Sequence, residues 1–264
     1  MDSAASASDP VLLVAVEAGV ATLTLNRPRA FNAVSSAMLD ALLQAIEALR
    51  HDASVRVVVI AGAGAAFSGG HDLKEMMANR NEAFIGALFE RCCTVMLALQ
   101  ALPQPVIARV HGTATAAGCQ MVAACDLAVA AADARFATSG INFGLFCATP
   151  GVPVSRNLSR KRAFEMLFTG DFIDAATALD WGLVNRVVPA ERLDAEIRGL
   201  VARIVEKPRA VVAAGKRFFY RQLEAPLADA YRLASRTITD NMLGDEAAEG
   251  VGAFIAKRKP SWPA

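Results

Sequence analysis

Apolar positions near the N-terminus of this 264-residue chain follow two different spacings. Two brief runs, 11–17 and 21–26, are rich in β-branched residues and too short for helices, so they predict strands. From Ser35 to Arg50, leucine and isoleucine recur at helical intervals, which predicts an amphipathic helix. The chain therefore opens with a strand–strand–helix unit.

Strands and helices alternate in the same way as far as about residue 190. One long helix is expected to end before Pro103 and Pro105, because proline cannot continue a helix. Alternation of this kind is typical of a parallel or mixed sheet covered by helices, so we predict the α/β class. Strands are predicted at 55–60, 106–110 and 127–130, and helices at 81–101 and 118–125.

The last part of the chain shows helical patterns and no convincing strand. Their apolar faces need a cover, and we expect another subunit to supply it, with a cap from the same chain as the alternative. These helices are predicted at 191–205, 208–222 and 225–258, the last with a break near Gly244. The resulting division is a disordered tail at 1–10, a core at 11–190 and a helical oligomerisation region at 191–264.

Composition narrows the class of protein. Basic residues number 27 and acidic residues 26, so the net charge of +1 gives no general field to attract nucleic acid or an anionic membrane. No apolar run reaches the roughly 18 residues that span a bilayer. The opening MDSAASASDP lacks the basic start of a secretory signal and the arginines of a mitochondrial transit peptide, so a cytoplasmic protein is expected. The five cysteines include no CxxC pair, which favours free thiols over disulfides or a metal site.

Two glycine-bearing segments carry the candidate chemistry. The first, GAGAAFSGGHDLK at 62–74, follows a predicted strand, and the second is GTATAAGCQMVAACD at 112–126. A dinucleotide fingerprint would need glycine where Phe67 stands, so that interpretation is rejected. The other interpretation is a pair of turns whose backbone N–H groups hold a developing oxyanion. Taken singly, each segment predicts something plainer, a tight turn in the first and close helix packing in the second.

Five motifs in a distinctive order give this pair a context. Together they resemble the crotonase, or enoyl-CoA hydratase/isomerase, superfamily from about residue 11 to Pro260, and the stretches GGHDLKE, ATAAGCQ and NFGLFCATPGV are most similar to one branch of it. The resemblance implies a crotonase-type ββα spiral core with a C-terminal helical trimerisation region, commonly assembled as a dimer of trimers, which is a hexamer. The motifs are LNRPRAFNAV at 25–34, GAGAAFSGGHDLKEM at 62–76, AAGCQ with the following Cys125-Asp126, FEMLFTGDFIDAATALDWGLVNRVV at 164–188, and AFIAKRKP near the end.

The resemblance also implies a substrate and a site. The substrate is an acyl-CoA thioester of the kind used in fatty acid metabolism, with no further cofactor. Backbone N–H groups of His71 and Ala117 would form an oxyanion hole, which stabilises a charged transition state more than the neutral substrate. The helix start at Gly118 adds the positive end of its dipole. The His71 imidazole is expected to be a packed or hydrogen-bonded ring, and His111 to be structural.

The two glutamates of efficient hydratases in this superfamily are missing. Their positions are held by Gln120, which can orient a water but cannot accept a proton, and by Gly140, which has no side chain. Efficient hydration is therefore not expected, although the lyase class is. An acyl-CoA decarboxylase, which needs no base, and a catalytically weak acyl-CoA-binding or regulatory protein are the alternatives. A serine hydrolase is not supported, since neither Ser68 nor Ser139 lies in a GxSxG elbow.

A CoA-binding set is implied by the same resemblance. It places the adenine and ribose-phosphate end beside residues 29–31, and further residues form a wall below His71. A C-terminal helix would bring an aromatic ring and a lysine to a neighbouring subunit's ligand, where stacking and a point charge suit adenine and phosphate. Without the resemblance, Arg29 is predicted to be a solvated charge, Phe254 core and Lys257 surface. The full set is Arg29, Ala30, Phe31, Gly70, Asp72, Leu73, Lys74, Gly118, Phe254 and Lys257.

Overall fold

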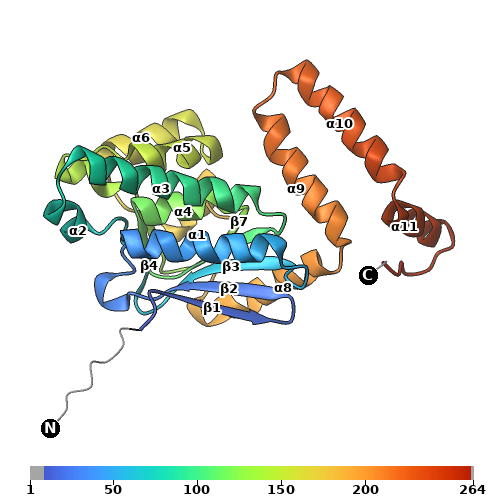
Figure 1. Ribbon diagram of the computed structural model, residues 1–264, viewed down its shortest axis with the longest axis horizontal. Coiled ribbons are helices and arrows are strands. Elements are labelled where there is room, and N and C mark those ends of the chain that lie inside the picture. Colours follow the sequence, from blue (N-terminus) through green and yellow to red (C-terminus); the bar gives the residue numbers. More distant parts are fainter. Residues whose placement is uncertain (1–8, 263–264) are drawn as a thin grey trace, which may run out of the picture.

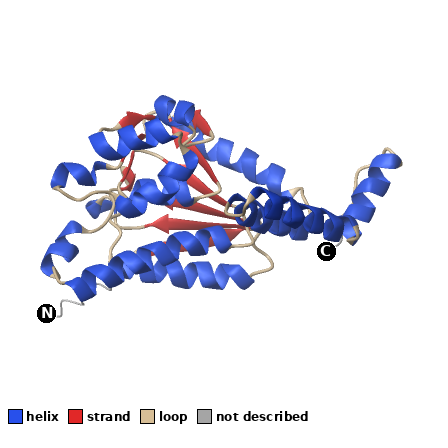
Figure 2. Ribbon diagram, turned by 90° about the horizontal axis from the view of Figure 1, so that it is seen from above, coloured by secondary structure: helices blue, strands red, loops and turns tan. Residues whose placement is uncertain are grey.

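The computed structural model describes residues 9–262, so nearly all of the predicted disordered tail lies outside the described residues. Strands and helices alternate as far as β10 (Arg186–Val188), and the α/β class predicted from the sequence is confirmed. Figures 1 and 2 show a core of sheets covered by helices, with further helices that project away from it. Across residues 9–262, none of the helices combines the length and the apolar character needed to cross a membrane.

A six-stranded sheet forms the centre of the core. Its order is β1-β2-β3-β5-β7-β10, with β1 antiparallel to β2 and every later pair parallel. Parallel neighbours need long crossover connections, which the intervening helices supply. The remaining bounds are β1 (Leu12–Glu17), β2 (Val20–Leu25), β3 (Val57–Gly62), β5 (Val106–Val110) and β7 (Leu127–Ala131).

A second sheet contains four short strands in the order β4-β6-β8-β9. The chain passes from a long strand to a short one three times, from β3 to β4, from β5 to β6 and from β7 to β8, and a helix follows each pair. This repeated strand–strand–helix unit builds the predicted spiral core, and β4 and β6 lead directly into the two glycine-bearing turns. The bounds are β4 (Ala66–Ser68), β6 (Thr113–Thr115), β8 (Arg135–Ala137) and β9 (Ile173–Asp174).

Both faces of the large sheet are buried, which explains why its strands are continuous apolar runs. In β3, Val58 and Ile60 belong to the main core, whereas Val57 and Val59 pack with α8 (Leu193–Val205) on the opposite face. Every residue of α4 is buried. The helices on the main-core side include α1 (Ser36–His51), α3 (Glu82–Ala101) and α4 (Ala117–Ala124).

Cap residues set the starts of the two long helices. The Ser35 side chain accepts a hydrogen bond from Met38 N–H at the start of α1, and Asn81 accepts one from Phe84 N–H at the start of α3. As predicted, α3 ends before Pro103. The remaining helical elements of the core are η1 (Pro28–Ala30), α2 (Leu73–Ala78), η2 (Ser139–Phe143), α5 (Ala148–Asn157), α6 (Arg160–Thr169), α7 (Ala175–Trp181) and η3 (Ala190–Arg192).

The last three helices form an arm that stands away from the core in Figure 1, and we use that name for α9 (Arg209–Leu223), α10 (Leu227–Met242) and α11 (Asp245–Ile255). No apolar residue of α9 or α10 is buried. A cavity of about 450 Å³ lies between these two helices, and its lining residues all belong to the arm. The large exposed apolar side chains here are Phe219, Leu223, Leu227, Tyr231, Ile238, Met242, Leu243, Val251, Phe254 and Ile255. That another subunit covers them stays a prediction.

A buried polar cluster anchors the arm to the core. The Lys216 side chain of α9 is only 7% exposed, and its Nζ lies 2.6 Å from the Asp126 carboxylate. The same Nζ donates to two backbone carbonyls near the end of α3, at 2.9 and 3.0 Å. Tyr220 O–H and Val106 N–H both donate to Asp126, each at 2.6 Å. Asp126 therefore joins the arm to the start of β5 and to the loop that follows α4.

Candidate functional site

Two turns of the core meet at the candidate site, and we call residues 69–72 and 116–118 the donor turns. A Cβ built on Gly70 would lie 2.9 Å from Ala116 Cβ and 3.3 Å from Ala117 N, so the two turns are in contact. Gly70 also has a φ of +91°, which other residues rarely adopt. A Cβ on Gly118 would lie 2.4 Å from Ser68 O. Glycine at both positions is therefore required for this close approach.

The backbone N–H groups of the first donor turn differ in whether they are hydrogen-bonded within the chain. Gly69 N–H donates to Phe31 O at 2.7 Å, Gly70 N–H to Ser68 Oγ at 3.3 Å, and Asp72 N–H to Val34 O at 3.2 Å. His71 N–H has no acceptor among residues 9–262. Gly70 O and Asp72 N–H both face Val34, and successive groups alternate in direction along an extended backbone. The free N–H of His71 therefore points away from Val34.

The second donor turn leaves another N–H group free. Ala116 N–H donates to Ala137 O at 3.0 Å, and Ala116 O accepts from Gln120 N–H at 2.9 Å. Ala117 is the first residue of α4, so its N–H has no partner within the helix, and none is found elsewhere in the described chain. Ala116 has φ 49° and ψ −118°, a conformation that costs energy for a residue with a Cβ. The positive end of α4 thus faces the first donor turn.

The His71 side chain is packed and hydrogen-bonded. Nδ1 lies 3.3 Å from Val34 O, and the ring meets Phe89 edge-on at 5.1 Å between centroids. Because a carbonyl can only accept, Nδ1 carries the proton. Burial lowers the pKa of the imidazole, so the ring is neutral near pH 7. Its Nε2 is buried and has no hydrogen-bond partner in the described part of the chain.

The two positions of the missing glutamates differ in the space around them. Gln120 is 2% exposed, and its Oε1 lies 3.9 Å from Cys92 Sγ, whose thiol donates to it. Gly140 lies in η2, and a Cβ built there would be 2.5 Å from Leu145 O and 2.9 Å from Cys147 Sγ. Position 120 therefore holds a side chain of the right size, whereas position 140 has no room for any side chain.

Hydroxyl groups join η2 to the second donor turn. Thr115 Oγ1 and Ser139 Oγ lie 2.8 Å apart, and Thr138 O–H donates to Met166 O at 2.7 Å. Burial raises the pKa of the Cys147 thiol, so it stays protonated near pH 7. These groups hold the loop in place and supply no base.

The residues predicted to bind CoA fall into two groups in space. Phe31 is 63% exposed, and its carbonyl contacts the first donor turn, so η1 with Arg29 and Ala30 lies beside the site. Leu73 and Lys74 are exposed in the first turn of α2. By contrast, Phe254 is 83% exposed at the end of α11 on the arm, and Lys257 follows that helix. One chain therefore brings only the first group to the donor turns, and the binding roles of both stay predictions.

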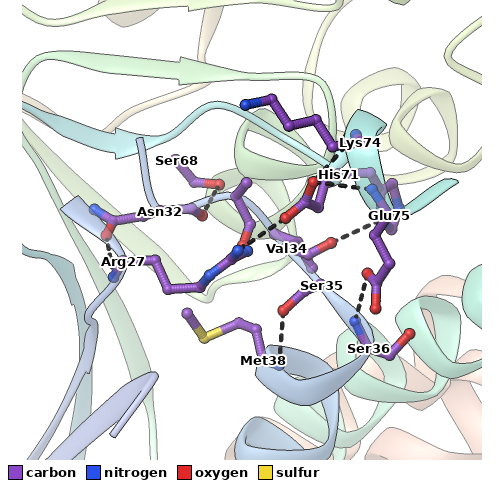
Figure 3. A network of polar contacts seen from close by, with 12 residues as sticks. Arg27, Asn32, Val34, Ser35, Ser36, Met38, Ser68, His71, Lys74 and Glu75 are labelled. Carbon is purple, nitrogen blue, oxygen red and sulfur yellow. Dashed lines mark hydrogen bonds and ion pairs between the residues drawn. The ribbon is translucent and has the colours of Figure 1, made fainter. Parts of the chain in front are cut away.

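Asp72 is already engaged by the protein. Its Oδ1 accepts from Lys74 N–H and Glu75 N–H, and its Oδ2 lies 2.8 Å from Arg27 Nη2. Burial raises the pKa of this carboxyl, but the bonds from Arg27 and the two N–H groups outweigh it and lower the pKa overall. Figure 3 shows this network, which also contains Asn32. Sequence reasoning did not single out Arg27 or Asn32, although both lie in the LNRPRAFNAV motif.

Comparisons with known proteins agree with this geometry. The family model for enoyl-CoA hydratase/isomerase matches residues 15–264. The chain is 45% identical over 253 residues to enoyl-CoA hydratase domain-containing protein 3, mitochondrial, of Xenopus laevis, covering 96% of this chain and 86% of that protein. A crystal structure of an enoyl-CoA hydratase of Mycobacterium smegmatis is similar with a TM-score of 0.95 and 60% identity, covering 96% of this chain and 99% of that one. The human enoyl-CoA hydratase domain-containing protein 3 has a TM-score of 0.93 and 42% identity, with 96% and 100% covered.

These comparisons correct one expectation and confirm others. The expected cytoplasmic location is wrong, because the relatives from Xenopus laevis, Mus musculus and Homo sapiens are named as mitochondrial proteins. That expectation rested on the composition of residues 1–10, whereas cellular addresses are read by receptors and leave no trace in the fold. The crotonase-type fold is confirmed, as is the branch indicated by GGHDLKE, ATAAGCQ and NFGLFCATPGV, that of enoyl-CoA hydratase domain-containing protein 3. The chain therefore belongs to the enoyl-CoA hydratase/isomerase family of the crotonase superfamily.

Proposed function

We propose that this protein is an acyl-CoA lyase that binds a thioester and stabilises negative charge on its carbonyl oxygen through His71 N–H and Ala117 N–H. The observation that carries the proposal is that these two N–H groups have no acceptor within residues 9–262 although the turns that contain them are in contact. Preorganised donors of this kind are worth about 10² to 10³ in rate each. No cofactor besides the CoA thioester itself is required.

Decarboxylation is the reaction that we favour over hydration. Hydration needs groups that activate water and protonate the α-carbon, and position 140 has no space for one of them. In decarboxylation the bond between the α-carbon and the carboxylate breaks, and its electron pair forms the enolate of the thioester. Carbon dioxide leaves, and the α-carbon then takes a proton from water. The two N–H donors stabilise the enolate oxygen, and no protein base takes part.

We further propose that the exposed apolar faces of the arm are covered by copies of the same chain in a trimer, or in a dimer of trimers. The support is that α9 and α10 contain no buried apolar residue although they carry several large apolar side chains. In such an assembly Phe254 and Lys257 would reach a neighbouring subunit's CoA. Light scattering of the purified protein tests the assembly, and a monomer at micromolar concentration would contradict it.

The thioester carbonyl gives a direct test of the donors. Calorimetry should show that acetyl-CoA binds more tightly than S-ethyl-CoA, a thioether that lacks the carbonyl oxygen. Equal affinities would contradict the oxyanion hole, and no binding of either compound would contradict the whole proposal.

A panel of substrates then tests the reaction. We expect carbon dioxide release from malonyl-CoA or methylmalonyl-CoA, and no loss of the conjugated absorbance of crotonyl-CoA above the rate in buffer. Rapid hydration of crotonyl-CoA would contradict the preference for decarboxylation. Tight binding of CoA esters without any turnover would instead support the catalytically weak binder.

A further inference from the structure

The first donor turn is held against the loop 27–36 by backbone hydrogen bonds and by the Arg27–Asp72 ion pair. We propose that Arg27 and Asp72 are positioning residues, which set the direction of His71 N–H and do not themselves contact the acyl group. This inference rests on the proposed function, because it assigns the pair a role in the same oxyanion site. Figure 3 shows Arg27 directed towards the turn that contains His71.

Arg27 connects three parts of the site. Its Nη2 lies 2.8 Å from Asp72 Oδ2, its Nη1 donates to Ala33 O at 2.9 Å, and its backbone N–H donates to Asn32 Oδ1 at 2.9 Å. The Arg27 and Asp72 side chains are 26% and 15% exposed, so solvent competes only partly for this ion pair. Arg27 therefore fixes both the loop 32–34 and the residue that follows His71.

The loop 32–34 in turn sets the direction of the donor. Val34 N–H donates to Gly70 O at 2.8 Å and Val34 O accepts from Asp72 N–H, so the peptide groups on both sides of His71 are tied to one residue. Ala33, which Arg27 holds, immediately precedes Val34. A rotation of the loop would therefore change the direction of His71 N–H. Arg27 thus acts on the donor through Ala33 and through Asp72 together.

Asn32 has a different role in the same network. It is fully buried, and its Nδ2 donates to three backbone carbonyls, those of Ala63, Ala66 and Phe67, at 2.8, 2.8 and 3.2 Å. These bonds fix the chain around β4, so loss of the Asn32 amide would disturb the core. Arg27 is the better subject for a test, because it is partly exposed and lies at the edge of the core.

The experiment compares Arg27→Gln with a matched control, Arg162→Gln. Arg162 of α6 likewise donates to one backbone carbonyl and one carboxylate, Asp180 O at 2.7 Å and Asp180 Oδ2 at 2.8 Å, and these bonds join α6 to α7. Two readouts are used on the full-length protein. The first is the ratio of affinities for acetyl-CoA and S-ethyl-CoA. The second is the infrared stretch of ¹³C-labelled acetyl-CoA carbonyl, which falls in frequency when N–H groups donate to the oxygen.

We expect Arg27→Gln to lower the affinity ratio about tenfold, the equivalent of one hydrogen bond, and to return the carbonyl band towards its frequency in solution. Arg27→Lys keeps the charge and should restore part of both effects, and Asp72→Asn should resemble Arg27→Gln. Affinity of Arg27→Gln for S-ethyl-CoA should match that of Arg162→Gln. Its thermal midpoint should be somewhat lower, because the Arg162 and Asp180 side chains are more exposed than those of Arg27 and Asp72.

Two results would overturn the inference. An unchanged ratio and band in Arg27→Gln would show that the pair does not position the donor, while the wild-type preference for the thioester would still support the proposed function. A wild-type protein that does not distinguish the two compounds would overturn the proposed function and this inference together.

Discussion

The donor turns and the arm differ in which of their groups are left without a partner in the chain, backbone N–H groups in the turns and apolar side chains in the arm. In the donor turns, the N–H groups of Gly69, Gly70, Asp72 and Ala116 are paired with other groups of the chain, whereas those of His71 and Ala117 have no acceptor among residues 9–262. The arm instead leaves large apolar side chains exposed, and a buried polar cluster around Asp126 joins it to the core. On the proposed function, a single chain would complete the oxyanion site, whereas the CoA-binding roles predicted for Phe254 and Lys257 would depend on assembly.

Removing the anchor of the arm should have the largest effect. Lys216→Met leaves the Asp126 carboxylate buried without its cation, which costs about 3 kcal/mol of unfolding free energy, near the lower end for a broken buried pair because Asp126 keeps 15% exposure. Urea denaturation at fixed protein concentration measures the loss. Arg217→Met, at the neighbouring exposed position of α9, is the control and should change little.

The same variant also tests the separation between the two regions. If the donor turns are complete in one chain, the carbonyl band of bound acetyl-CoA should keep its wild-type frequency in Lys216→Met even as the assembly weakens. A band that shifts with loss of the anchor would show that the arm shapes the oxyanion site.

Adding a methyl group between the donor turns should give the next largest loss of stability. Gly118→Ala places a methyl group 2.4 Å from Ser68 O, which forces the two turns apart and costs about 1–3 kcal/mol. The preference for acetyl-CoA over S-ethyl-CoA should be lost in the same variant. Gly199→Ala in α8 is the matched control, since its Cβ would meet nothing within 4 Å and should add about 0.5–1 kcal/mol through helix propensity. Normal thioester preference in Gly118→Ala would contradict the close-packed site.

His71 should make a smaller contribution to stability, which depends on pH. Burial lowers its pKa below 6.5 in the folded protein, so between 6.5 and that lower pKa the unfolded chain binds a proton that the folded chain does not. Stability therefore falls as the pH drops through this window, by at most about 1.4 kcal/mol per pH unit, and is fully present above it. Denaturant unfolding between pH 7.5 and 5 measures the slope, which His71→Phe should flatten. An unchanged slope in that variant would assign the effect to other groups.

The long elements could be predicted from the sequence because their patterns are local. The predicted helix at 81–101 is α3 (Glu82–Ala101), and the predicted strand at 106–110 is β5 (Val106–Val110). The short strands of the second sheet span two or three residues, which is too few for a hydrophobic period to show. The long helical pattern at 225–258 proved to be two helices that meet near Gly244, where the break was expected.

The candidate site shows the same limit. Motif order located both donor turns, but the positioning network depends on contacts between residues far apart in the chain, such as Arg27 with Asp72 and Asn32 with Phe67. No periodicity reports such pairs. Position 140 has no space for a side chain because residues 145 and 147 lie against it. The order of residues in the sequence does not predict this contact either.

The smallest expected effect is at position 140, where introducing a glutamate should add almost nothing to the rate of hydration. A correctly placed general acid or base is worth about 10² to 10⁴ in rate, so restoring both glutamates would normally raise hydration strongly. In Gln120→Glu with Gly140→Glu, however, the new Cβ at 140 collides with Leu145 O and Cys147 Sγ. We expect the double variant to hydrate crotonyl-CoA no faster than Gln120→Glu alone, and to melt at a lower temperature. Gly86→Glu, whose Cβ would meet nothing within 4 Å, controls for the added charge. A hundredfold gain in the double variant would show that η2 yields easily and that only the carboxylates separate this site from a hydratase.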